Sequence, residues 1–117
     1  MKRYLLLTCG RRNKYNARKV GGYDSGREYS RAQQLKLLQK AGEISGLREQ
    51  VSFELLPSRR NAAGYMERAV RYIADFVYTD NRTGVTVVED TKGVRTPEYV
   101  IKRKLMLHIH GITVTEI

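Results

Sequence analysis

Three residues, Asp75, Asp90 and Lys92, have the types and spacing that phosphodiester chemistry uses. Asp75 lies inside the apolar run 73–77, and Asp90 and Lys92 follow the apolar run 85–88. Aspartate is disfavoured in strands, and burying its charge is costly unless a partner compensates it. Two aspartates in neighbouring strands therefore indicate a functional site.

Side-chain alternation predicts that these groups converge. Asp90 and Lys92 are two residues apart, so they share one face of a sheet. A four-residue loop between the two strands sets Asp75 directly opposite Asp90, and a loop two residues longer or shorter sets them diagonally. Either register brings two carboxylates together. Hard carboxylate oxygens in this geometry suit Mg²⁺ or Mn²⁺.

Lys92 and Glu28 each have two interpretations. Lys92 neutralises charge that develops on a phosphate beside a bound metal, or it only pairs with Asp90 across solvent. Glu28 completes a capping box with Ser25, or it leans over the metal as a third carboxylate from the start of a helix. Glu89 is expected to point to the opposite face of the sheet and to pair with a basic helix residue.

Cap, turn and alternation signals predict one α/β domain with the element order αβββαβ. Residues 58–70 are ambiguous, because 61–70 are compatible with either a helix or a loop that leads into a strand. A tight turn makes the second and third strands antiparallel, and the last helix is long enough for a parallel crossover. The expected product is a mixed four-stranded sheet flanked by helices. Its elements are a helix from about 25 to 41, strands over 50–56, 71–78 and 85–88, a helix between Thr96 and Gly111, and a strand over 112–117.

Length and charge limit the function classes. The 117 residues suffice for one domain, and 22 Lys and Arg against 12 Asp and Glu give a net charge of +10. This excess favours a polyanionic partner, most often nucleic acid. The single cysteine, Cys9, excludes an internal disulfide framework. No apolar run approaches the roughly 20 residues that a membrane span needs, so we expect a cytoplasmic protein without a membrane partner.

Basic residues cluster near the start of the chain and around the last helix. We divide the chain into a basic N-terminal arm, 1–22, and a core domain, 23–117, because Gly21 and Gly22 interrupt it after a run of positive charge without acids. The candidate DNA contacts are Arg11, Arg12, Lys14, Arg18, Lys19, Arg95, Lys102 and Lys104.

Glu28 on a first helix, Asp75 in a second strand and Asp90-Thr91-Lys92 in a third strand resemble the PD-(D/E)xK nuclease superfamily. A longer string over residues 14–117 resembles one small phage and prophage branch, which is catalogued as a domain of unknown function and is similar to transposon-end nucleases and Holliday-junction resolvases. The segments that carry this resemblance are Lys14-Tyr15-Asn16-Ala17, Tyr23-Asp24-Ser25, Leu35-Lys36-Leu37-Leu38, Ala41-Gly42-Glu43-Ile44, Phe53-Glu54-Leu55, Tyr72-Ile73-Ala74-Asp75-Phe76, Val88-Glu89-Asp90-Thr91-Lys92-Gly93, Thr96-Pro97 and Lys102-Arg103-Lys104-Leu105.

The resemblance implies roles for these residues. Asp75, Asp90 and the backbone carbonyl of Thr91 would hold Mg²⁺ or Mn²⁺, with Glu28 as the first-helix acid and Lys92 as the catalytic lysine. Ala74 stands where the superfamily has its naming proline, a common departure.

The resemblance also implies a restriction-endonuclease-like fold and a metal-dependent DNA endonuclease. Such an enzyme would serve phage recombination, replication or branched-DNA processing, including Holliday junctions, and would act as a homodimer. The alternative is a non-catalytic basic nucleic-acid-binding module. A small RNA-binding protein would explain the charge but not the two aspartates.

Overall fold

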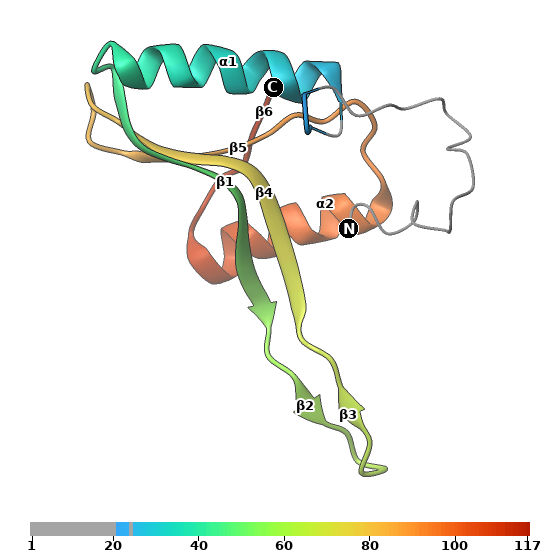
Figure 1. Ribbon diagram of the computed structural model, residues 1–117. Coiled ribbons are helices and arrows are strands. Elements are labelled where there is room, and N and C mark those ends of the chain that lie inside the picture. Colours follow the sequence, from blue (N-terminus) through green and yellow to red (C-terminus); the bar gives the residue numbers. More distant parts are fainter. Residues whose placement is uncertain (1–20, 24) are drawn as a thin grey trace.

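The computed structural model describes residues 21–23 and 25–117. Helices and strands follow one another along this part of the chain in the predicted order, with one inserted hairpin (Figure 1). The elements are α1 (Gly26–Lys40), β1 (Ile44–Leu56), β2 (Arg59–Arg60), β3 (Met66–Glu67), β4 (Val70–Asp80), β5 (Thr86–Asp90), α2 (Pro97–Leu105), the π-helical turn η2 (Met106–His110) and β6 (Thr115–Glu116).

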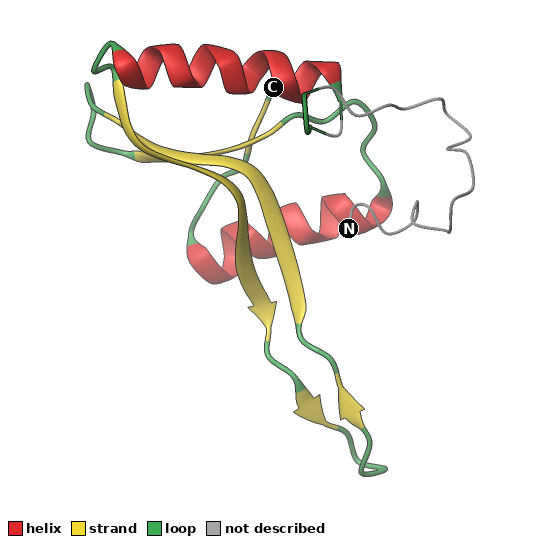
Figure 2. Ribbon diagram, viewed as in Figure 1, coloured by secondary structure: helices red, strands yellow, loops and turns green. Residues whose placement is uncertain are grey.

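Four strands form one mixed sheet in the order β1-β4-β5-β6. β1 pairs antiparallel with β4, and β4 pairs antiparallel with β5, whereas β5 and β6 run parallel. Parallel neighbours need a crossover connection, and the chain makes it through α2 and η2 (Figure 2). The predicted mixed four-stranded sheet, with helices beside it, is therefore confirmed.

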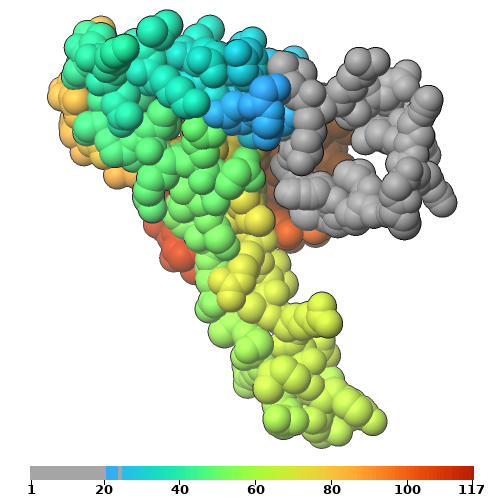
Figure 3. Space-filling view, viewed as in Figure 1, coloured from blue at the N-terminus to red at the C-terminus, as the bar shows by residue number. Residues whose placement is uncertain are grey.

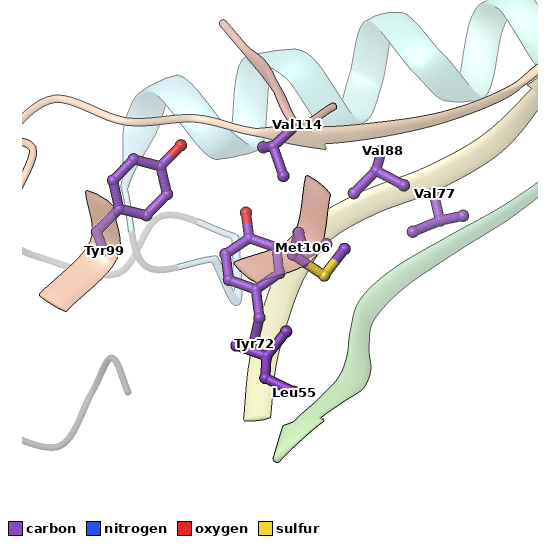
Figure 4. Packing of buried hydrophobic residues seen from close by; sticks show 8 residues of the cluster. Leu55, Tyr72, Val77, Val88, Tyr99, Met106 and Val114 are labelled. Atoms are coloured by element: carbon purple, nitrogen blue, oxygen red, sulfur yellow. The ribbon is translucent and has the colours of Figure 1, made fainter. Parts of the chain in front are cut away.

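The two helices cover opposite faces of the sheet (Figure 1). On the α1 side, Ala32 and Leu35 pack against residues of β1 and β4. The core on the α2 side is larger (Figure 4) and consists of Leu55, Tyr72, Ala74, Val77, Val88, Tyr99, Met106 and Val114. Because helices cover both faces, every residue of 74–78 in β4 is buried, including the aspartate among them.

Local signals end the helices where the sequence predicts. The side chains of Ser25 and Thr96 each accept a hydrogen bond from the backbone N–H three residues further on, and Pro97 occupies the first turn of α2. Gly42 and Gly111 have φ of 82° and 69°. Left-handed backbone of this kind favours glycine after a helix.

The sequence predicted that the first strand begins at residue 50, but β1 begins at Ile44. A register shift between Ser45 and Arg48 marks a bulge next to Gly46, whose φ is 65°. A bulge moves side chains out of strict alternation. The periodic pattern that identifies a strand is therefore visible only after the bulge.

Residues 58–70 do not form a helix; a loop over 61–65 leads into strand β3, as the second prediction has it, but a further short strand, β2, precedes that loop. They continue the β1 and β4 pair as the β2–β3 hairpin, which projects away from the two helices (Figures 1 and 3). In the space-filling view this hairpin stands clear of the rest of the molecule. Its strands are too short for a periodic signal, which is why the sequence left this segment undecided.

Candidate active site

Asp75 and Asp90 face each other across the pairing of β4 and β5. The register pairs Phe76 with Glu89, and its next position sets Asp75 opposite Asp90. The same register runs back to the turn, where Thr79 pairs with Thr86. Of the two registers that the sequence left open, the four-residue loop with direct opposition is therefore the one present.

The two carboxyl groups are buried and close together. Asp75 and Asp90 are each 2% exposed, and they lie near enough for Asp75 to act on the titration of Asp90. Burial, followed by the neighbouring carboxyl group of Asp75 and its negative charge, raises the pKa of Asp90 to about 7, although the Tyr72 hydroxyl and the charge of Lys92 act in the opposite direction. At neutral pH Asp90 is therefore poised between its acid and its carboxylate form.

The two carboxylate oxygens of Asp90 differ in their hydrogen bonding. The hydroxyl of Tyr72 donates to Asp90 Oδ2, and burial keeps that hydroxyl protonated by raising the pKa of Tyr72. Asp90 Oδ1 is buried and has no hydrogen-bond partner in the described part of the chain. A buried carboxylate oxygen of this kind is costly unless a proton or a cation meets it.

Thr91 and Gln50 hold the carboxylate of Asp75. Thr91 donates to Asp75 Oδ2 from its backbone nitrogen at 2.9 Å and from its hydroxyl at 2.8 Å, while Gln50 Nε2 lies 3.3 Å from Asp75 Oδ1. The sequence predicted a role for the Thr91 carbonyl only. The N–H and hydroxyl of Thr91 thus orient the opposing aspartate.

Gln50 is a site residue that sequence reasoning missed. Its φ of 53° makes it the only non-glycine residue with positive φ in the described part of the chain. Strained backbone of this kind costs on the order of 1–3 kcal/mol and persists where surrounding contacts over-determine it. In sequence Gln50 is only a polar residue at the edge of an alternating pattern, so nothing in its neighbourhood marked it.

Glu28 satisfies parts of both predicted interpretations. Its backbone N–H donates to Ser25 Oγ at 3.1 Å, so the helix cap is present. Its side chain, however, is turned toward the sheet: Glu28 is 5% exposed and accepts a hydrogen bond from Gln50 Nε2 at 3.0 Å. The same amide also reaches Asp75. Gln50 therefore links the first-helix acid to the aspartate pair.

Lys92 lies beside Asp90. Its Nζ is 3.6 Å from Asp90 Oδ2 and 4.4 Å from the centre of the Tyr99 ring, and its backbone carbonyl accepts a hydrogen bond from Arg27 at 3.2 Å. The side chain is 19% exposed. The pairing with Asp90 is thus present, in a partly buried setting and over an aromatic face that favours a cation.

Glu89 points to the other face of the sheet, as predicted. Its carboxylate receives two hydrogen bonds from Arg31 of α1, at 2.8 and 2.6 Å, and another from the hydroxyl of Tyr78. Burial and this contact raise the pKa of Tyr78 to about 12. Glu89 is therefore a structural partner of the first helix and does not take part in the site.

The donor set fits a divalent cation held by two carboxylates. No group of three or more His, Cys, Asp or Glu side chains is arranged to hold a metal among residues 21–23 and 25–117. Mg²⁺, however, is usually bound through one or two carboxylates and keeps several waters. The oxygen Asp90 Oδ1, which has no hydrogen-bond partner among the described residues, and the facing carboxylate of Asp75 match that requirement. Glu28 reaches the pair through Gln50.

The candidate DNA contacts differ in their surroundings. Arg95 donates to Glu116 at 2.8 and 2.5 Å, and Lys102 pairs with Glu98 at 3.1 Å. Both are thus already engaged within the protein, whereas Lys104 is exposed. The remaining candidates lie outside the described residues, as does most of the predicted arm 1–22; they are Arg11, Arg12, Lys14, Arg18 and Lys19.

The chain is therefore a mixed α/β domain with a buried pair of aspartates at the end of a strand pair. The sequence pattern of a family described as "Protein of unknown function (DUF1064)" matches residues 12–114, and the chain belongs to that family. Comparisons with curated proteins and with solved structures found no match. None of the described helices is both long and apolar enough to cross a membrane.

Proposed function

We propose that the protein is a metal-dependent DNA endonuclease with a restriction-endonuclease-like fold of the PD-(D/E)xK type. The observation that carries this proposal is the pair of facing, buried carboxylates next to a partly buried lysine, with one oxygen that has no hydrogen-bond partner in the described part of the chain. Desolvated like charges raise the free energy of a fold. A chain retains such a pair where binding of a cation repays that cost.

The residues of the site take distinct roles in this proposal. Asp75 and Asp90 hold Mg²⁺ or Mn²⁺, which when bound activates water and polarises the phosphodiester. Thr91 and Gln50 orient Asp75. Lys92 presents its ammonium where the phosphate oxygens gather charge during hydrolysis.

DNA is the proposed substrate because the chain carries a net charge of +10, which attracts a polyanion. One site cuts one strand, so the processing of branched DNA, such as a Holliday junction, requires two sites. A two-fold homodimer is the simplest assembly that supplies them. The resemblance to a phage and prophage branch supports a role in recombination or replication, in a host cytoplasm.

Plasmid nicking with and without Mg²⁺, together with a gel shift on the same preparations, tests the proposal. Asp75→Asn should abolish nicking and leave DNA binding equal or tighter, because it removes a metal ligand and a negative charge that faces phosphate. Asp80→Asn is the matched control, since it makes the same substitution on the same strand, outside the site. We expect it to retain both nicking and binding.

Two results would contradict the proposal. Nicking by Asp75→Asn at the wild-type rate would remove the site assignment. Binding of DNA by the wild type without Mg²⁺-dependent nicking would favour the alternative, a non-catalytic nucleic-acid-binding module.

A further inference from the structure

The β2–β3 hairpin has no core to stabilise it. Every residue from 56 to 68 is exposed, and the hairpin stands away from both helices (Figure 3). A two-stranded hairpin alone is at best marginally stable in water. A fold that extends one outward without covering it exposes backbone and side chains for contact with something else.

The tip of this hairpin is nevertheless organised by its own hydrogen bonds. The side-chain oxygen of Asn61 accepts from the backbone N–H groups of Ala63 and Tyr65, at 2.9 and 3.0 Å. Arg60 donates to the carbonyl of Gly64 at 2.6 Å, and Gly64 has the left-handed φ of 89° that such a turn requires. A pre-formed tip loses less entropy when it binds.

Charge on the hairpin selects the kind of partner. Residues 57–69 contain three arginines and one acid, Glu67. Arg59 and Arg68 form no ion pair within the described part of the chain, so their guanidinium groups stay available. This local excess of positive charge attracts a polyanion and would repel the same hairpin of a second copy.

An aromatic side chain occupies the tip between these charges. Tyr65 is 72% exposed and its neighbour Met66 is 54% exposed. An exposed ring next to arginines is the combination that proteins use to stack on a nucleic-acid base while they hold the backbone. The face of a base is accessible only where the duplex is open, as at a branch point or in a single strand.

We infer that the β2–β3 hairpin binds branched DNA. In this complex Arg59 and Arg68 contact phosphates and Tyr65 stacks on an exposed base. This inference rests on DNA as the substrate of the proposed function. It adds that recognition of the branch comes from a surface outside the aspartate site. A two-stranded β-ribbon is narrow enough to lie in the major groove, so the β2–β3 hairpin can follow the duplex up to the branch.

Fluorescence anisotropy tests whether the β2–β3 hairpin binds DNA. The full chain is titrated into a labelled duplex and a labelled four-way junction without divalent metal. The double variant Arg59→Gln/Arg68→Gln should bind both DNAs about ten-fold more weakly, and its slope of log K against log salt should fall by roughly 2, for two lost phosphate contacts. The matched control Lys40→Gln/Arg82→Gln removes two charges from the opposite end of the β1–β4 pair. It should change both quantities much less.

Tyr65 is tested separately from charge. Tyr65→Ala should weaken binding to the junction by about ten-fold and leave binding to the duplex nearly unchanged, because only the junction offers an open base. Tyr65→Phe keeps the ring and should bind the junction like the wild type.

The outcomes separate this inference from the proposed nuclease. Loss of DNA binding in the hairpin variants, with no nicking by the wild type, would support DNA binding by the hairpin and contradict the proposed nuclease activity. Mg²⁺-dependent nicking by the wild type, with equal DNA affinity in all variants, would overturn only the inference that the hairpin binds DNA. Absence of any DNA binding by the wild type would also overturn the inference that the hairpin binds DNA. A change in self-association by light scattering, with unchanged DNA affinity, would assign the hairpin to a dimer interface instead.

Discussion

Replacement of Asp90 by asparagine should stabilise the metal-free protein at alkaline pH, although it removes a proposed metal ligand. The pKa of Asp90 rises from 3.8 to about 7 on folding, so the folded state binds this proton more tightly than the unfolded chain does. Such a group favours folding below its unfolded pKa, and this contribution is lost as pH rises through the folded pKa. Stability of the wild type should therefore fall between about pH 4 and about pH 7.

The size of the effect follows from the same change in proton affinity. Each factor of ten corresponds to about 1.4 kcal/mol, so ionised Asp90 destabilises the metal-free fold by up to about 4 kcal/mol. Asparagine removes this cost, keeps an acceptor for Tyr72, and leaves Lys92 without its carboxylate partner. We expect a net gain of about 2 kcal/mol at about pH 8, or roughly 10 °C in Tm.

Thermal unfolding at about pH 8 and about pH 4, with and without Mg²⁺, measures this prediction. The variant Asp90→Asn should be more stable than the wild type only at the higher pH, and Mg²⁺ should raise the Tm of the wild type alone, because the metal needs the ionised carboxylate. Asp80→Asn serves as the control. A variant less stable than the wild type at the higher pH, or an equal difference at both pH values, would refute the reasoning.

Two further predictions concern the acids on either side of the aspartate pair. Glu28→Gln should lower nicking by orders of magnitude with little change in Tm, because the cap uses the backbone N–H of Glu28 whereas its carboxylate meets Gln50; loss of Tm with retained nicking would make Glu28 purely structural. Glu116→Gln should destabilise the fold by about 2 kcal/mol near neutral pH, since Glu116 accepts from Arg95, Tyr99 and Arg103. These bonds, led by that of Arg95, lower the pKa of Glu116 to about 2, so its contribution is present above the ordinary pKa of 4.5 and lost as pH falls toward 2. Chemical denaturation across this range checks it, and a difference that is independent of pH would contradict it.

Local chemistry in the sequence determined most of the framework. Ser25, Pro97 and Gly111 end or begin helices through contacts with residues a few positions away, so their signals need no knowledge of the fold. The turn length between β4 and β5 sets the register of the hairpin. The sequence alone therefore placed Asp75 directly or diagonally opposite Asp90, depending on the loop length, and Glu89 on the other face.

Tertiary structure decided the features that depend on residues far apart in the chain. Gln50 connects Glu28 to Asp75 only because a bulged β1 lies beside β4 and beneath α1. Whether Arg95 is available for DNA depended on where Glu116 comes to lie, whereas the pair of Lys102 with Glu98 is local to α2.

The hairpin over 58–70 also depended on the tertiary structure. Two-residue strands have no periodic pattern, and they form here because the long β1 and β4 pair extends into them. Burial works in the same way: the raised pKa of Asp90 comes chiefly from desolvation by elements that cover both faces of the sheet. Spacing in a sequence predicts which side chains share a face, but only the packed fold determines how much water remains around them.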